Sequence, residues 1–323
     1  MYKISIITPS YNQAEYIEQT IQSVLSQNYP NLEYIIIDGA STDGSAEIIK
    51  KYESQLAYWV SEPDKGQSDA INKGLKRATG DIVAWLNSDD LYLPETFLTV
   101  NSAFVDNDDI RVILGGVENF YPDSGRREIW SYESFDTVDF FNRVAIHQPG
   151  VFWKREIMEK TGYLDEQLYY LMDYDLWMRF LLNFPFKVLN ESLAEFRVHA
   201  LAKTSNNPAG MYLEYRKVIS RVVNSIPSTV WKKEVETLGI YDNPESKKYV
   251  LDFGKIEKHF VSIRKNYVIN CALQEYTFGS ISKSSRLFVY AFTNYLHYKS
   301  VLYLLFNFLG ITYLRRKLFN SSW

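Results

Sequence analysis

The fold is decided by one short stretch, Ile82-Val83-Ala84-Trp85-Leu86-Asn87-Ser88-Asp89-Asp90. Its run of five apolar residues predicts a strand buried on both faces, as in a largely parallel sheet. The run stops abruptly and delivers polar side chains to its carboxyl end, where ligands bind in open α/β sheets. Two adjacent carboxylates there are typical of a divalent cation site that holds phosphates. The alternative is an acidic turn before a helix, for which Pro94 is a good first-turn residue.

Strands and helices alternate upstream of this stretch. We expect strands at 3–8, 32–37, 58–60 and 81–86, with helices after Asn12, at Ser45 and near Ser68. In the first helix, Asn12 and Glu15 have the spacing of a capping box. Such alternation predicts a parallel sheet with right-handed crossovers. The polar loops after the strands should then lie at one edge and line one cleft; these loops are 8–13, 38–44, 61–69 and 87–90.

Length and composition predict a folded chain of roughly two domains, because 323 residues exceed one average domain. A single cysteine, Cys271, excludes an internal disulfide framework and any multi-cysteine metal site. The residues from Lys3 to Ile7 read as a strand rather than a signal peptide. We therefore expect a cytoplasmic protein.

Charge is unevenly distributed along the chain. Residues 244–323 contain twelve Lys or Arg against four Asp or Glu, a net charge of +8. Because the whole chain has a net charge of −4, the residues before 244 have a net charge of −12. An acidic N-terminal part and a basic, aromatic C-terminal part indicate units with different partners. We expect an α/β domain at 1–205, a connecting segment at 206–243 and a helical region at 244–323.

The last part of the chain contains an apolar run at 301–314, followed by Arg315-Arg316-Lys317. Its length is short for a membrane span, which needs about 20 residues. Basic neighbours fit a helix lying on the inner face of the cytoplasmic membrane. A helix packed on the core and a homodimer contact are the open alternatives.

Four motifs together resemble the family-2 glycosyltransferases over about the first 205 residues. They are Thr8-Pro9-Ser10-Tyr11-Asn12, the turn from Ile37 to Ser45, the segment from Asp64 to Gly74, and Asn87-Ser88-Asp89-Asp90. Each motif alone is weak, but their order and their positions after strands are specific. The resemblance implies a GT-A fold, which is a Rossmann-like, mostly parallel sheet with helices on both faces. It also implies inversion at the anomeric carbon and a nucleotide-diphosphate sugar as donor.

The resemblance assigns the donor site to strand ends. It implies that Asp38 accepts a hydrogen bond from the nucleobase, typically uracil, and that the segment after Asp64 lies against the nucleotide. A plain polar loop is the alternative for that segment. The residues implied to contact the donor are Thr8, Pro9, Tyr11, Asp38, Asp64, Lys65, Gln67, Asn72, Asn87, Ser88 and Arg197.

The family's metal motif has carboxylates at both ends of an Asp-x-Asp triplet, but here an amide, Asn87, takes the first position. Asp89 is then the expected ligand of Mn²⁺ or Mg²⁺, with Asp90 as an alternative. A late histidine, His199, resembles the family's additional metal ligand.

The family's catalytic base is the second residue of an acidic pair. The pair aligns with Met172-Asp173, so Asp173 keeps the base position and would deprotonate the acceptor hydroxyl. The alternative is a carboxylate that stabilises a helix N-terminus. We expect Asp175 and Arg179 to form a structural i,i+4 pair. His147 faces the acceptor or packs in the core.

The resemblance therefore implies an inverting transferase that moves a sugar from a UDP-linked donor to a hydroxyl of a saccharide or lipid-linked saccharide, in surface polysaccharide or glycolipid assembly. No nucleic acid partner is expected. A nucleotidyltransferase is the first alternative, but it needs a glycine-rich basic loop where Pro9 to Asn12 stand. A catalytically inactive sugar-nucleotide-binding protein is the second, and only Met172 and Asn87 favour it.

Overall fold

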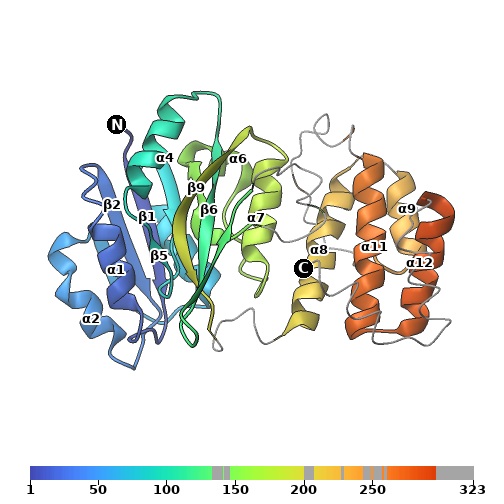
Figure 1. Ribbon diagram of the computed structural model, residues 1–323, viewed down its shortest axis with the longest axis horizontal. Helices are drawn as coiled ribbons and strands as arrows, with labels where there is room; N and C mark the ends of the chain where they lie inside the picture. The colour runs from blue at the N-terminus through green and yellow to red at the C-terminus, as the bar shows by residue number, and fades with distance from the viewer. Residues whose placement is uncertain are drawn as a thin grey trace. The chain divides into compact units, whose positions relative to one another are not determined.

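The computed structural model divides the chain into two units (Figure 1). The first contains the β-sheet and comprises Met1–Asp136, Ala145–Asn207 and Tyr249–Asp252. The second is helical and comprises Thr137–Val144, Pro208–Lys248 and Phe253–Trp323. The structure describes residues 1–132, 141, 146–199, 207–226, 229–242, 249, 257 and 260–295.

The first four strands of the sheet are parallel neighbours in the order β3-β2-β1-β4, as the alternation predicted. Their bounds are Ile4–Ser10 for β1, Leu32–Asp38 for β2, Tyr58–Ser61 for β3 and Ile82–Trp85 for β4. Buried aliphatic residues fill β1, β2 and β4, which explains why these runs form strands at the centre of a sheet. The polar segments after these strands therefore share one sheet edge, as predicted.

β1 differs from its predicted bounds because it continues through Pro9 to Ser10. Proline lacks an N–H, so it fits a strand only where no ladder bond is needed. β4 ends at Trp85, and the last bond on that side runs from Leu86 N to Ile7 O. Pro9 lies beyond this bond, and the strand can therefore reach Ser10, whose carbonyl accepts from Gly39 N at 2.8 Å.

The rest of the sheet is mixed, which the sequence did not predict. β4 pairs antiparallel with β8 (Val151–Lys154). Beyond β8, the neighbouring strands of the sheet are, in order, β6 (Val112–Tyr121), β9 (Phe186–Arg197) and the two-residue β5 (Leu91–Tyr92). β7 (Arg126–Trp130) pairs with β6. β9 is one continuous strand, and its register with β6 shifts at Gly116.

Helices flank the sheet in the first unit (Figure 1). Their bounds are Ile17–Leu25 for α1, Ser45–Lys51 for α2, Gln67–Arg77 for α3, Thr96–Val105 for α4, Met158–Thr161 for α6 and Met172–Leu181 for α7. The capping box predicted for α1 was wrong. The helix begins at Ile17 without a side-chain cap, and Asn12, at φ 52°, instead accepts a hydrogen bond from Thr42 N at 3.0 Å.

Close packing of α3 and α7 on the strands positions the site. At Gly74 of α3, a Cβ atom would lie 2.4 Å from Ile7 Cγ2, so glycine is needed for this helix to approach β1. Trp177 of α7 stacks on Trp85 of β4 with ring centroids 5.2 Å apart, and Trp153 of β8 packs edge-on against Trp85 at 5.7 Å. Aromatic pairs in these arrangements add to the stability gained from burial.

The helical unit contains α8 (Pro208–Ser225), α9 (Thr229–Thr237), α11 (Phe260–Phe278) and α12 (Ile281–Tyr295). The carboxylate of Glu234 on α9 joins three of these helices, because it accepts bonds from Arg264, Tyr290 and Tyr295. Within the described ranges, no helix is both long and apolar enough to cross a membrane. The run at 301–314 and its basic neighbours lie outside the described residues.

Candidate active site

The ends of β4 and β9 bring a carboxylate and an imidazole together. β5 follows Asp90 directly and pairs antiparallel with β9, with Leu91 opposite Glu195. This pairing carries the end of β9 to the turn after β4, and His199 Nε2 lies 3.1 Å from Asp89 Oδ2. The side chain of Asp89 is 21% exposed and that of His199 is 9% exposed. Two residues far apart in the sequence thus form one polar pair at the sheet edge.

Asp90, next to this pair, is buried, and hydrogen bonds hold its carboxylate in place. Its carboxylate accepts bonds from Arg197 N at 3.0 Å and from Asn87 Nδ2 at 3.3 Å. Burial and the neighbouring charge of Asp89 raise the pKa of Asp90 well above its usual range. The backbone of the turn is fixed as well, because Thr20 Oγ1 donates to the carbonyl of Ser88, which is itself buried. Asp89 is therefore the carboxylate of this turn that reaches toward solvent.

Arg197 and His199 pack against the start of α1. The guanidinium of Arg197 lies 4.8 Å from the ring centroid of Tyr16, and the His199 ring lies 5.2 Å from it. Arg197 Nη2 donates to Gln19 Oε1 at 2.7 Å. Arg197 Nη1 and His199 Nδ1 are buried without hydrogen-bond partners among the described residues. A bound anion would satisfy Arg197 Nη1, since buried donors without partners are costly.

Tyr16 and Gln19 are site residues that the sequence did not identify. They lie three positions apart around the first turn of α1, a spacing that places two side chains on one helix face. That spacing is common on any helix, so the sequence carries no sign that this face meets the end of β9.

The ends of β1, β2 and β3 converge at Gly39. A Cβ atom at Gly39 would lie 2.6 Å from Asp64 Oδ2 and 3.3 Å from the Tyr11 ring, so glycine leaves room for both. Asp38 is buried and accepts bonds from Ser41 N at 2.9 Å and from Ser61 Oγ at 2.6 Å. The structure brings the predicted residues Tyr11, Asp38 and Asp64 together. Thr8 and Pro9 are buried beneath them, and Thr8 Oγ1 lies 3.0 Å from Tyr34 Oη.

The loop before α3 is held by its own hydrogen bonds. Asp64 Oδ1 accepts from Gly66 N at 2.7 Å, and Gly66, at φ 111°, has a backbone conformation that favours glycine. Lys65 N donates to Asp69 Oδ2 at 3.0 Å, and the Lys65 side chain is exposed. This geometry presents a cation beside the helix N-terminus, where anions bind favourably.

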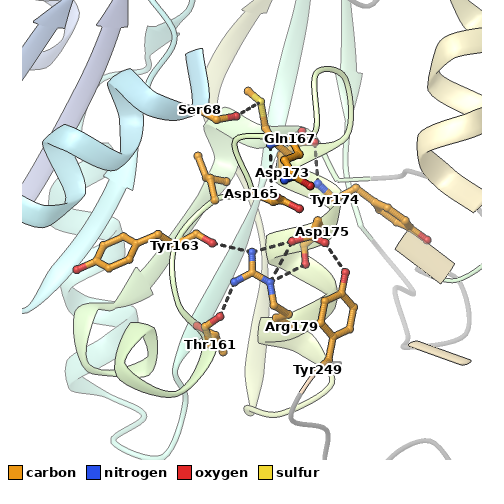
Figure 2. A network of polar contacts seen from close by, with 12 residues as sticks. Ser68, Thr161, Tyr163, Asp165, Gln167, Asp173, Tyr174, Asp175, Arg179 and Tyr249 are labelled. Atoms are coloured by element: carbon orange, nitrogen blue, oxygen red, sulfur yellow. Dashed lines mark hydrogen bonds and ion pairs between the residues drawn. The ribbon is translucent and has the colours of Figure 1, made fainter. Parts of the chain in front are cut away.

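The first turn of α3 links the end of β4 to the start of α7. Gln67 Nε2 donates to Asn87 Oδ1 at 2.9 Å, and the next residue, Ser68, donates from Oγ to Met172 Sδ at 3.0 Å. Asp173 follows Met172 in the first turn of α7 and is half-buried, with Oδ1 accepting from Tyr174 N at 2.7 Å (Figure 2). α3 therefore connects the strand end that carries Asp89 to the helix that carries Asp173.

Asn72 is one predicted donor contact that the structure does not bring to this cluster. Its side chain is buried, and it bonds both backbone groups of Leu164: Nδ2 donates to the carbonyl and Oδ1 accepts from the N–H, each at 3.0 Å. Because Asn72 lies more than a turn into α3, on the face toward the protein interior, it holds the segment before α7.

His147 packs among aromatic rings, which agrees with the core alternative. Its ring centroid lies 5.0 Å from that of Trp130 and 5.4 Å from that of Phe196. Burial lowers the pKa of His147 from 6.5 to about 4. The expected i,i+4 pair is confirmed, because Arg179 Nη2 lies 2.8 Å from Asp175 Oδ2.

The low pKa of His147 predicts that acid destabilises the fold. Between pH 6.5 and about 4, the unfolded chain binds more protons at this residue than the folded chain. The contribution of neutral His147 to the free energy of unfolding is therefore fully present above pH 6.5. It falls as the pH approaches 4, by about 2 kcal/mol after allowance for partial exposure of the ring. Urea denaturation between pH 7.5 and 4.5 measures this loss. The variant His147→Gln should show a shallower dependence, and equal slopes would contradict the prediction.

The Asp89–His199 pair fits a divalent cation. Its 3.1 Å separation is close to that of neighbouring ligands in an octahedral shell with bonds of about 2.1 Å. A carboxylate oxygen with an imidazole nitrogen suits Mn²⁺. Among the residues that the structure describes, no group of three or more His, Cys, Asp or Glu side chains could hold a metal. The pair therefore offers two protein ligands and leaves the other positions for ligand and water oxygens.

Solved structures share this fold. TarS 1-349 of S. aureus in complex with UDP-GlcNAc aligns with a TM-score of 0.57 and 19% identity, over 89% of this chain and 83% of that chain. The mannosyltransferase PcManGT of Pyrobaculum calidifontis, in complex with GDP-Man and Mn²⁺, aligns with a TM-score of 0.56 and 16% identity, over 99% of this chain and 83% of that chain. The sheet and its flanking helices have the GT-A fold.

Sequence comparison identifies the family. The model described as glycosyl transferase family 2 matches residues 5–161. The putative teichuronic acid biosynthesis glycosyltransferase TuaG of Bacillus subtilis is 31% identical over 272 residues, which are 82% of this chain and 96% of the relative. The chain belongs to glycosyltransferase family 2, as the four motifs predicted.

Proposed function

We propose that this glycosyltransferase moves a sugar from a UDP-sugar to a hydroxyl of a saccharide or lipid-linked saccharide, with inversion and with Mn²⁺ or Mg²⁺ as cofactor. The observation that carries the proposal is the 3.1 Å approach of His199 Nε2 to Asp89 Oδ2 at the edge shared by the parallel strands. The bridge from Gln67 and Ser68 to the helix of Asp173 supports a reaction at the same edge.

The donor would lie across the strand ends. Tyr11 and Asp64, which both lie next to Gly39, would enclose the nucleoside. Asp38 would accept from the base while Ser41 and Ser61 hold its carboxylate in place. Arg197 Nη1, buried without a partner among the described residues, would bind the diphosphate together with Lys65. Asn87 and Ser88 would shape the turn beneath it.

Asp89 and His199 would hold the metal, which when bound stabilises negative charge on the departing diphosphate. Asp90 would serve as an alternative ligand only if its bonds to Arg197 and Asn87 opened. Asp173 would accept the proton of the acceptor hydroxyl as that oxygen attacks the anomeric carbon. A single displacement of this kind inverts the anomeric configuration.

The acceptor class rests on the relatives. TuaG is named for teichuronic acid biosynthesis, and this supports a role in surface polysaccharide assembly. We further propose that the enzyme lies at the inner face of the cytoplasmic membrane, with residues 244–323, which contain twelve Lys or Arg against four Asp or Glu, as the contact. The neighbours bind UDP-GlcNAc in one case and GDP-Man in the other, so the nucleotide is the first point to test.

The test uses the purified full chain with Mn²⁺ and a panel of UDP-sugars and GDP-mannose. Thermal denaturation should show a higher midpoint with the cognate donor, because ligands that bind only the folded state stabilise it. Chromatography should then show free nucleoside diphosphate, which forms slowly by donor hydrolysis without an acceptor. Release of pyrophosphate from a nucleoside triphosphate would favour a nucleotidyltransferase. Donor binding without any turnover in the presence of saccharide acceptors would favour an inactive binding protein.

A further inference from the structure

A buried polar network lies behind the first turn of α7, on Asp175, Arg179 and Tyr249 (Figure 2). Asp175 is 1% exposed, Arg179 is 8% exposed and Tyr249 is 9% exposed. Asp175 Oδ2 accepts from Arg179 Nε at 3.1 Å and from Nη2 at 2.8 Å. The other carboxylate oxygen, Oδ1, accepts from the hydroxyl of Tyr249. Each carboxylate oxygen thus has a different partner.

Arg179 extends the network to the turn between α6 and α7. Its Nη1 donates to the carbonyl of Thr161, and its Nη2 donates to the carbonyl of Tyr163 at 2.9 Å. Gly162 lies between them at φ 76°, a backbone conformation that favours glycine. This turn allows both carbonyls to face one guanidinium, whose planar fork suits several acceptors at once.

Tyr249 reaches this network from far along the chain. It follows α8 and α9 of the helical unit in sequence, yet it belongs to the sheet-containing unit. The network therefore joins two turns of α7, the turn at Gly162 and a segment 74 positions beyond Asp175. On the opposite side, Ser68 and Asn72 of α3 hold Met172 and Leu164.

We propose that Tyr249 is a positioning residue for the transfer reaction, which acts by holding the first turn of α7 and thereby Asp173. The inference rests on the proposed function, because it takes Asp173 as the base. Asp175 lies two residues after Asp173 in the same turn, and its N–H donates to Leu171 O at 3.0 Å. A shift of Asp175 therefore moves the backbone that orients Asp173. Misplacement of a reacting group by about 1 Å can cost about 100-fold in rate.

The variant Tyr249→Phe tests this inference, with Tyr267→Phe as the matched control. Tyr267 is also buried, and its hydroxyl donates to Ile240 O at 2.6 Å in the helical unit. Both variants lose one buried phenol hydrogen bond, and the loss of stability should be at least as large in Tyr249→Phe, because its acceptor is a carboxylate whereas that of Tyr267 is a backbone carbonyl. Only Tyr249→Phe should lower kcat, by about tenfold, while the donor Kd stays within about twofold of the parent. An unchanged kcat, or an equal fall in Tyr267→Phe, would overturn the inference.

A second variant, Arg179→Lys, tests the same inference if Tyr249→Phe does not fold. Arg179→Lys keeps the positive charge but removes the planar fork that joins Asp175 to the turn at Gly162. It should lower kcat at constant donor Kd, and the double variant should lose less than the product of the two single effects because both act on one network. If Asp173→Asn remained active, the proposed base would fail; if Asp173→Asn were inactive and both network variants kept full kcat, only the present inference would fail.

Discussion

Replacing Asp173 with asparagine should reduce kcat by about 10²- to 10⁴-fold, the usual contribution of a general base. The amide cannot accept the acceptor's proton, although it has nearly the same size and can still accept the bond from Tyr174 N. Donor binding should be unaffected, because Asp173 lies on α7 and the donor residues lie at the strand ends. Turnover at saturating donor and acceptor, together with calorimetric binding of UDP and Mn²⁺, separates the two effects.

The variant Glu47→Gln is the control for this prediction. Glu47 lies in the first turn of α2 and is exposed, so it interacts with a helix N-terminus as Asp173 does, but away from the site. Loss of such an interaction costs about 0.3–1 kcal/mol. If Asp173 served only as a helix-stabilising carboxylate, both variants would lose comparable stability and retain activity. Retained turnover in Asp173→Asn would remove it from the mechanism.

Replacing Asp89 with asparagine should abolish most metal-dependent activity, by at least about 100-fold. The estimate follows because removal of groups that only support a metal ligand already costs 10- to 100-fold. Asp89 contributes the charged half of the pair with His199, and an amide oxygen binds a divalent cation less strongly. Titration of activity with Mn²⁺ should show a higher half-saturating concentration, and His199→Gln should behave similarly. Chelation with EDTA should remove the activity of the parent.

The Mn²⁺-dependent rise in melting temperature with UDP provides a readout besides activity. It should be reduced in Asp89→Asn and retained in Asp81→Asn, which removes an exposed carboxylate at the opposite end of β4. Equal Mn²⁺ responses in the two variants would argue against a metal at Asp89. Full activity of the parent in EDTA would argue against any metal role.

The first half of the fold could be predicted because its signals are local. Apolar runs such as Ile82 to Leu86, and helical periodicity between them, specify strands and helices without reference to distant residues. Parallel pairing then follows from the alternation, and it places the polar segments at one edge. The pairing of the strands in the second half of the sheet could not be predicted, because β5 has only two residues and the register between β9 and β6 shifts at Gly116.

The candidate site divides in the same way. Sequence patterns predicted that polar loops follow parallel strands, and the motifs identified the family and singled out Asp38, Asp89 and Asp173. The tertiary structure adds that the Asp89 and His199 side chains lie 3.1 Å apart, that Asp90 and Asn72 form hydrogen bonds inside the protein, that Tyr16 packs against His199, and that Tyr249 donates to Asp175. The physical reason is that strand pairing and side-chain packing join residues more than a hundred positions apart. The run from Ile82 to Asp90 does not indicate that β8 pairs antiparallel with β4.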